Sequence, residues 1–84
     1  MGKEMYTFSS QQSAISGQIK LIVNGNEKDV SEGATILGLL NELAIKPQGI
    51  AVELNLEIVP KSKFGETVLK NGDKIEIVRM AGGG

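Results

Sequence analysis

The 84-residue sequence contains no cysteine and no histidine. Without these residues the chain has no disulfide, no thiol nucleophile, no imidazole base and no zinc site of the usual kind. Most of the chemistry that proteins perform with their own side chains is therefore excluded. The lack of cysteine also fits a reducing compartment, and we expect the protein to be cytoplasmic.

Long apolar runs and an excess of one charge are also missing. The longest apolar stretches are a few residues, which is too short for a membrane span. Nine Lys and Arg residues oppose ten Asp and Glu residues, and no basic cluster carries interleaved aromatic residues. We therefore expect neither a membrane nor a nucleic acid as partner. The length suits one domain with one core.

The chain divides into three parts. Residues 1–18 are rich in Ser and Gln and show no hydrophobic period, which predicts a flexible leader, either a native extension or an added segment. Residues 19–80 carry regular patterns and are predicted to form the folded domain. Residues 81–84 are predicted to form a flexible glycine tail.

The folded part begins with a predicted β-hairpin. The segment IKLIVN, which starts at Ile19, is followed by the turn-forming pair Asn24-Gly25 and by NEKDV, and this order is typical of a hairpin. Alternation in the first strand turns Leu21 to the core and Ile22 to the opposite face.

A helix is predicted from about Ile36 to Ala44, with Thr35 as its N-cap. Its apolar residues recur at helical spacing and must pack against a sheet. They are Ile36, Leu39, Leu40 and Leu43. We also expect Phe64, in the polar connection 61–68, to lie in the core.

Alternation from Ile50 predicts a further strand with a short return. The turn type of that return, at Asn55-Leu56, stays open because Leu resists positive φ. After the turn at 71–73, the segment KIEIVRM forms the last strand. One helix covering one face of a small mixed sheet is an α+β arrangement, and this order of elements predicts a β-grasp.

In four ordered segments the chain resembles the ThiS group of sulfur carriers, which is related in fold to ubiquitin and to MoaD. The segments are IKLIVNG, ATILGLLNEL, IAVELNLEIVPKSKF and NGDKIEIVRMAGGG. The resemblance extends from Ile19 to Gly84 and implies a ubiquitin-like β-grasp.

The resemblance implies a function in thiamine biosynthesis. A ThiF-like adenylyltransferase, similar to the ubiquitin activators, uses ATP to adenylate the terminal carboxylate, and a persulfide donor then supplies sulfur. The resulting thiocarboxylate gives its sulfur to a ThiG-like thiazole synthase. The carrier itself is expected to be no enzyme, to bind no cofactor stably and to be a monomer when free.

The tail residues suit this chemistry. Gly84, the expected acceptor of AMP and sulfur, has no Cβ to crowd its carboxyl carbon, and Gly83 and Gly82 allow the chain to enter a narrow channel. With Ala81, the tail can extend roughly 13 Å beyond the last strand.

The folded head must supply the affinity for the partners, because ordering the tail costs about 1 to 2 kcal/mol per residue. We expect the partner surface to lie on the sheet face away from the helix. Its predicted apolar centre is Ile22, Val78 and Met80, and Arg79 and Glu76 are expected at its rim.

Three other functions remain open. A MoaD-like carrier for molybdopterin synthesis would share the fold, the tail and the activation chemistry. A ubiquitin-like interaction module would bind partners with an idle tail. A conjugating modifier would join its tail to lysines of other proteins.

Overall fold

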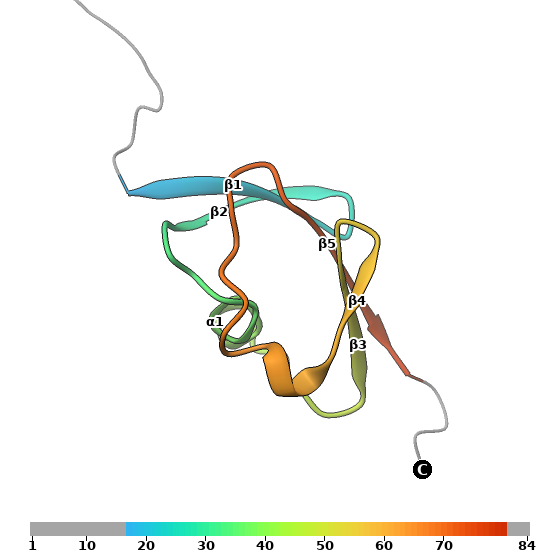
Figure 1. Ribbon diagram of the computed structural model, residues 1–84. Helices are drawn as coiled ribbons and strands as arrows, with labels where there is room; N and C mark the ends of the chain where they lie inside the picture. Colours follow the sequence, from blue (N-terminus) through green and yellow to red (C-terminus); the bar gives the residue numbers. More distant parts are fainter. Residues whose placement is uncertain (1–16, 81–84) are drawn as a thin grey trace, which may run out of the picture.

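The computed structural model describes residues 17–80 as a five-stranded sheet that curves around one α-helix (Figure 1). The elements are β1 (Gln18–Val23), β2 (Asn26–Ser31), α1 (Ile36–Glu42), β3 (Ile50–Leu54), β4 (Glu57–Val59), the 3-10 helix η2 (Lys61–Lys63) and β5 (Lys74–Arg79). The strand order is β2-β1-β5-β3-β4, with β1 and β5 parallel and the other neighbours antiparallel. This mixed sheet with one helix confirms the predicted β-grasp.

The core lies between α1 and the facing side of the sheet. Its buried residues are Leu21, Val30, Ile36, Leu39, Leu40, Ile50, Val52, Phe64, Leu69 and Ile75. The predicted positions of the helix stripe and of Phe64 are thereby confirmed, and Leu43 packs at the margin, partly buried. Thr35 is the N-cap, as predicted, because its Oγ1 accepts a hydrogen bond from the Gly38 N–H at 3.1 Å.

The helix ends at Glu42, earlier than the predicted end near Ala44. Ala44 adopts a left-handed backbone (φ 59°), and its N–H donates to the Asn41 carbonyl at 3.1 Å. The Ile45 N–H donates to the Leu40 carbonyl at 2.9 Å. These two bonds form a Schellman motif. Leu43 continues the helical spacing of apolar residues although the helix has ended at Glu42. The spacing therefore predicts a helix that is too long.

Both hairpins turn through two residues with positive φ. The first pair, Asn24-Gly25, has φ of 49° and 84°, and the second pair, Asn55-Leu56, has φ of 52° and 73°. Two positive values are typical of a type I′ turn, which matches the twist of the flanking strands. This result settles the turn type that the sequence left open. Leu56 adopts the left-handed conformation although it is not glycine, and it is 86% exposed.

The two ends of the described chain lie at opposite ends of the sheet (Figure 1), because the first and last strands run parallel. The first strand begins at Gln18, one residue before the predicted domain start, and the Glu32 N–H donates to the Gly17 carbonyl at 2.7 Å. In residues 17–80 no helix has the length and apolarity needed to cross a membrane.

Candidate functional site at the end of the last strand

The last strand ends at the surface, at one end of the sheet. The predicted tail residues Ala81, Gly82, Gly83 and Gly84 lie outside the described residues. Their attachment point is described: the Met80 N–H donates to the Gly49 carbonyl at 2.9 Å, so the strand remains held by its β3 neighbour up to Met80. Any segment that follows therefore starts from a fixed position.

Alternation along β5 separates core residues from surface residues. Ile75 is fully buried and Ile77 packs against the core. Val78 and Met80 lie on the opposite side of the sheet and are 52% and 53% exposed. We call this side, which faces away from α1, the outer face.

Ile22 shares the outer face but lies far from the end of β5. In the parallel register it is the partner of Lys74, four residues before Val78, which corresponds to about 13 Å along the strand. The expected group of Ile22 with Val78 and Met80 is therefore divided between two ends of the face.

Arg79 lies on the other side of the sheet from Val78. Its partner across β3 is Ile50, which belongs to the core, and paired residues share a face. Arg79 is exposed and is the last residue of the strand. Arg79 therefore lies at the edge of the opposite face, and not at the rim beside Val78 where the sequence analysis expected it.

One apolar residue lies next to Val78, and a second lies on the strand beyond it. The cross-strand partner of Val78 is Ala51, and Ile58, which is 71% exposed, lies diagonally from Ala51 on β4. We call Ala51, Ile58, Val78 and Met80 the tail-proximal patch. Alternation from Ile50 carries the signal that Ala51 faces away from the core, although it was not used to predict the site. The register that sets Ala51 against Val78 comes from tertiary packing and has no local signal.

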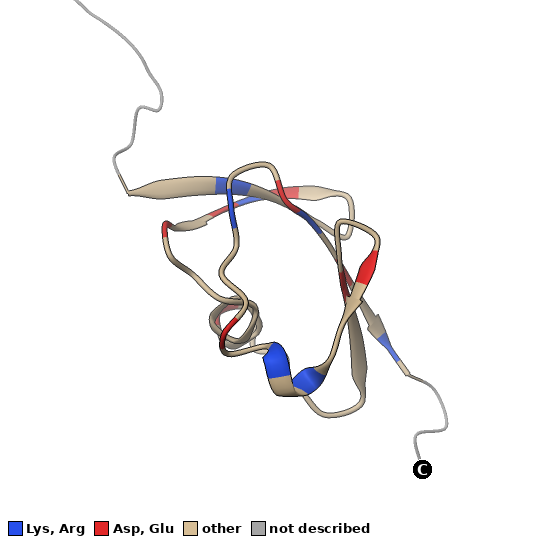
Figure 2. Ribbon diagram, viewed as in Figure 1, with Lys and Arg blue, Asp and Glu red and all other residues tan. Residues whose placement is uncertain are grey.

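Two carboxylates border the tail-proximal patch. Glu53 on β3 is paired directly with Glu76 on β5, and within residues 17–80 neither carboxylate forms an ion pair. Like charges that face each other across strands repel. A basic group placed between them is expected to be attracted by both. Elsewhere basic and acidic residues are interspersed along the ribbon (Figure 2).

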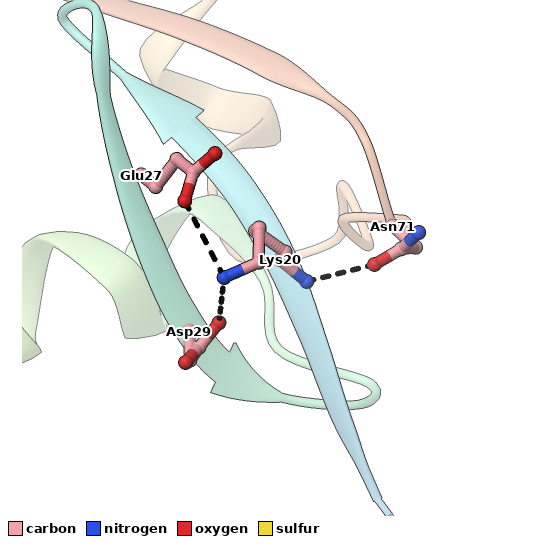
Figure 3. Close-up of polar contacts among 4 residues, drawn as sticks. All are labelled: Lys20, Glu27, Asp29 and Asn71. Atoms are coloured by element: carbon pink, nitrogen blue, oxygen red, sulfur yellow. Dashed lines mark hydrogen bonds and ion pairs between the residues drawn. The ribbon is translucent and has the colours of Figure 1, made fainter. Parts of the chain in front are cut away.

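At the far end of the outer face Lys20 is paired with two carboxylates of the neighbouring strand (Figure 3). Lys20 Nζ lies 3.0 Å from Asp29 Oδ1 and 3.6 Å from Glu27 Oε1, and the Lys20 N–H donates to Asn71 Oδ1 at 2.8 Å. The hydrogen bond to Asp29, helped by the charges of Asp29 and Glu27, raises the pKa of Lys20 above its ordinary value of 10.5. These contacts join β1, β2 and the turn before β5, which is a structural role.

The described residues offer a binding surface. No group of three or more Asp and Glu side chains in residues 17–80 is arranged to hold a metal ion. What the site combines is a fixed strand end, a half-exposed apolar patch beside it and two adjacent carboxylates. Such an arrangement can dock a partner and present the chain end to it.

Comparisons with known proteins agree on one family. A sequence model of the ThiS family matches residues 14–84. A thiazole synthase of Paramagnetospirillum magneticum is 47% identical over 66 residues, which are 79% of this chain and 20% of that protein. The sulfur carrier protein ThiS of Bacillus subtilis is 39% identical over 62 residues, which are 70% of this chain and 94% of that protein.

A solved structure has the same fold. The crystal structure of a thiamine biosynthesis protein (ThiS) from Geobacter metallireducens aligns with a TM-score of 0.70 and 33% identity, covering 79% of this chain and 100% of that one. The chain thus spans the whole length of this small protein, but only about a fifth of the thiazole synthase.

Proposed function

The chain belongs to the ThiS family, and from this membership we propose that it is a sulfur carrier for the synthesis of the thiazole of thiamine. It acts as a protein co-substrate and catalyses no step itself. The relatives named sulfur carrier protein ThiS support this proposal. So does the arrangement of the described residues, in which the last strand runs to the surface beside an apolar patch.

The reacting group in this proposal is the carboxylate of Gly84. A carboxylate is a poor electrophile, so a ThiF-like adenylyltransferase first joins it to the α-phosphate of ATP, and pyrophosphate leaves. The terminal sulfur of a persulfide then attacks the acyl carbon, and AMP leaves. A thiol reduces the remaining S–S bond and releases the thiocarboxylate. Gly84 and Gly83 present this carbon without side chains that would block the enzyme.

A thiazole synthase is the proposed acceptor of the sulfur. The name of the relative from Paramagnetospirillum magneticum supports this choice, because a segment similar to this chain forms part of that synthase. The activating enzyme, the persulfide donor and a cytoplasmic setting with a monomeric free carrier follow from the family chemistry and complete the proposal.

Docking of the head is proposed to use the tail-proximal patch. Val78 and Met80 supply half-exposed apolar surface next to the tail. Glu76, together with Glu53, supplies negative charge at its border, so the partner surface is expected to place a basic side chain there. Ile22 and Arg79 are expected to contribute less, because they lie at the far end and on the opposite face.

Intact-mass analysis tests the proposal. The full chain is incubated with ATP, an adenylyltransferase of the ThiF type and a persulfide donor. The expected result is replacement of one oxygen by sulfur, located in the C-terminal peptide. This step requires Gly84 to be the last residue of the mature chain, which the same spectrum establishes. A chain without Gly84 is the control, and it should fold but gain no sulfur.

The proposal fails if the mass of the full chain stays unchanged with an adenylyltransferase that modifies a known ThiS protein in parallel. It also fails if the shortened chain gains sulfur as readily as the full one.

A further inference from the structure

The central strand β5 is held on each of its two sides by an asparagine of a hairpin turn. Asn24 and Asn55 each occupy the first of the two central positions of a type I′ turn, with φ of 49° and 52°. The Asn24 N–H donates to the Ile75 carbonyl at 2.8 Å, and the Asn55 N–H donates to the Lys74 carbonyl at 2.8 Å. The two turns thus contact β5 from its two sides.

The carboxamide groups of both asparagines also bind β5. Asn24 Oδ1 accepts from the Ile77 N–H at 2.7 Å, and Asn24 Nδ2 donates to the Ile77 carbonyl at 3.2 Å. Asn55 Oδ1 accepts from the Lys74 N–H at 2.9 Å, and Asn55 Nδ2 donates to Asp73 Oδ1 at 3.0 Å. Asn55 therefore fixes the start of the strand, whereas Asn24 fixes the part that leads to the tail.

Asn24 takes the place of the strand that is missing beside Ile77. Pairing between β1 and β5 ends at Val23 and Ile75, because the chain turns back at Asn24-Gly25. A side-chain amide carries the same donor and acceptor as a peptide group. The carboxamide can therefore continue the ladder to Ile77, and it satisfies both backbone groups of that residue.

We propose that Asn24 is a positioning residue for the sulfur-carrying tail. On one side of β5 it holds Ile77, and on the other side Gly49 holds Met80. Between these two attachments lies Val78 of the tail-proximal patch. Fixing both sides sets the direction in which the chain leaves the sheet and keeps the patch in a constant relation to the tail. This inference rests on the proposed function.

Loss of the carboxamide is expected to act on binding of the tail. The strand between Ile77 and Met80 would gain backbone freedom, and an enzyme that binds the tail would have to remove it again. Ordering the backbone of one additional residue costs about 1 to 2 kcal/mol. If binding of the tail must supply this free energy, the KM for the carrier rises by about tenfold. Once the tail is bound in the enzyme's channel, the reacting groups are the same as in the unmodified chain. The kcat should therefore stay within about twofold.

The two asparagines provide a matched pair of variants. Asn24→Gly and Asn55→Gly each remove a carboxamide that binds β5, and glycine accepts positive φ, so neither introduces backbone strain. Carrier-dependent pyrophosphate release by the adenylyltransferase gives KM and kcat for each variant. Circular dichroism first establishes a temperature at which both variants are folded. We expect a raised KM for Asn24→Gly and an unchanged KM for Asn55→Gly.

Amide hydrogen exchange gives a second readout that needs no enzyme. Asn24→Gly should speed exchange at Ile77, and Asn55→Gly should speed it at Lys74, because each amide loses its acceptor. Unchanged exchange at Ile77 in Asn24→Gly overturns the inference.

The enzymatic outcomes separate this inference from the proposed function. If the unmodified chain is not adenylated, the proposed function fails and the positioning role fails with it. If the unmodified chain is adenylated but Asn24→Gly has the same KM, only the positioning role fails. An equal rise of KM in Asn55→Gly also overturns the positioning role, because it would indicate a general effect of weakening β5.

Discussion

Replacing Val78 by Ser should weaken docking of the head without preventing folding. Val78 lies in the tail-proximal patch and is 52% exposed, so about half of its side chain is available to a partner. Full burial of a valine contributes about 1.5 to 3 kcal/mol, and the exposed half about 1 kcal/mol. Loss of that amount raises the dissociation constant about fivefold.

The chain contains a matched control for this variant. Val68 is also 52% exposed, but it pairs with Thr35 beside the start of α1 and not on the outer face. Val68→Ser removes the same atoms from a surface of the same exposure. We therefore expect Val68→Ser to bind partners as the unmodified chain does, with a similar loss of stability in both variants.

Isothermal titration calorimetry measures the two dissociation constants directly, first with the adenylyltransferase and then with the thiazole synthase. Urea unfolding of each variant verifies that both are folded under the conditions of the titration. Equal affinities of Val78→Ser and the unmodified chain would refute the assignment of the patch. An equal loss in Val68→Ser would also refute it, because the effect would not then depend on the outer face.

Three further predictions concern the fold. Leu56→Gly should stabilise the protein by about 0.5 kcal/mol, because glycine relieves the left-handed strain at φ 73° and loses part of that gain to chain entropy; the urea midpoint should rise. Phe64→Ala should cost about 3 to 5 kcal/mol, since Phe64 is 2% exposed in the core, and thermal unfolding should show the loss. The raised pKa of Lys20 predicts stability that is present below its ordinary pKa of 10.5 and is lost as the pH rises through the higher pKa of the folded state; Lys20→Met should remove this alkaline change in the urea midpoint.

Local patterns in the sequence predicted the fold because each pattern has a direct physical cause. Period-two alternation fixes which side of a strand is apolar, and the 3.6-residue period fixes the helix stripe. Both led to the observed core around Leu21 and Leu39. The end of the helix could not be predicted from the sequence. Ala44 adopts a left-handed conformation there, and alanine gives no signal for that conformation.

The candidate site was predicted in part. Alternation placed Val78, Met80 and Ile22 on the outer face, which agrees with the structure. It could not place Ile22 along the strand, because the register of a parallel pair is set by packing of the crossover and not by either strand alone. The same alternation indicates that Arg79 lies on the opposite face from Val78. The prediction that Arg79 lies at the rim of the surface around Val78 was therefore inconsistent with the pattern.

The position of β5 in the sheet suits the proposed presentation of the chain end to an enzyme. The last strand is central, with β1 on one side and β3 on the other. An edge strand could be peeled away when a partner pulls on the residues that follow it, whereas a central strand must break pairing on both sides. The antiparallel pairing with β3 extends to Arg79, but the parallel pairing with β1 stops at Ile75. The second half of β5 is therefore held on one side by a strand and on the other by the Asn24 carboxamide, and this is the contact on which the proposed positioning of the tail depends.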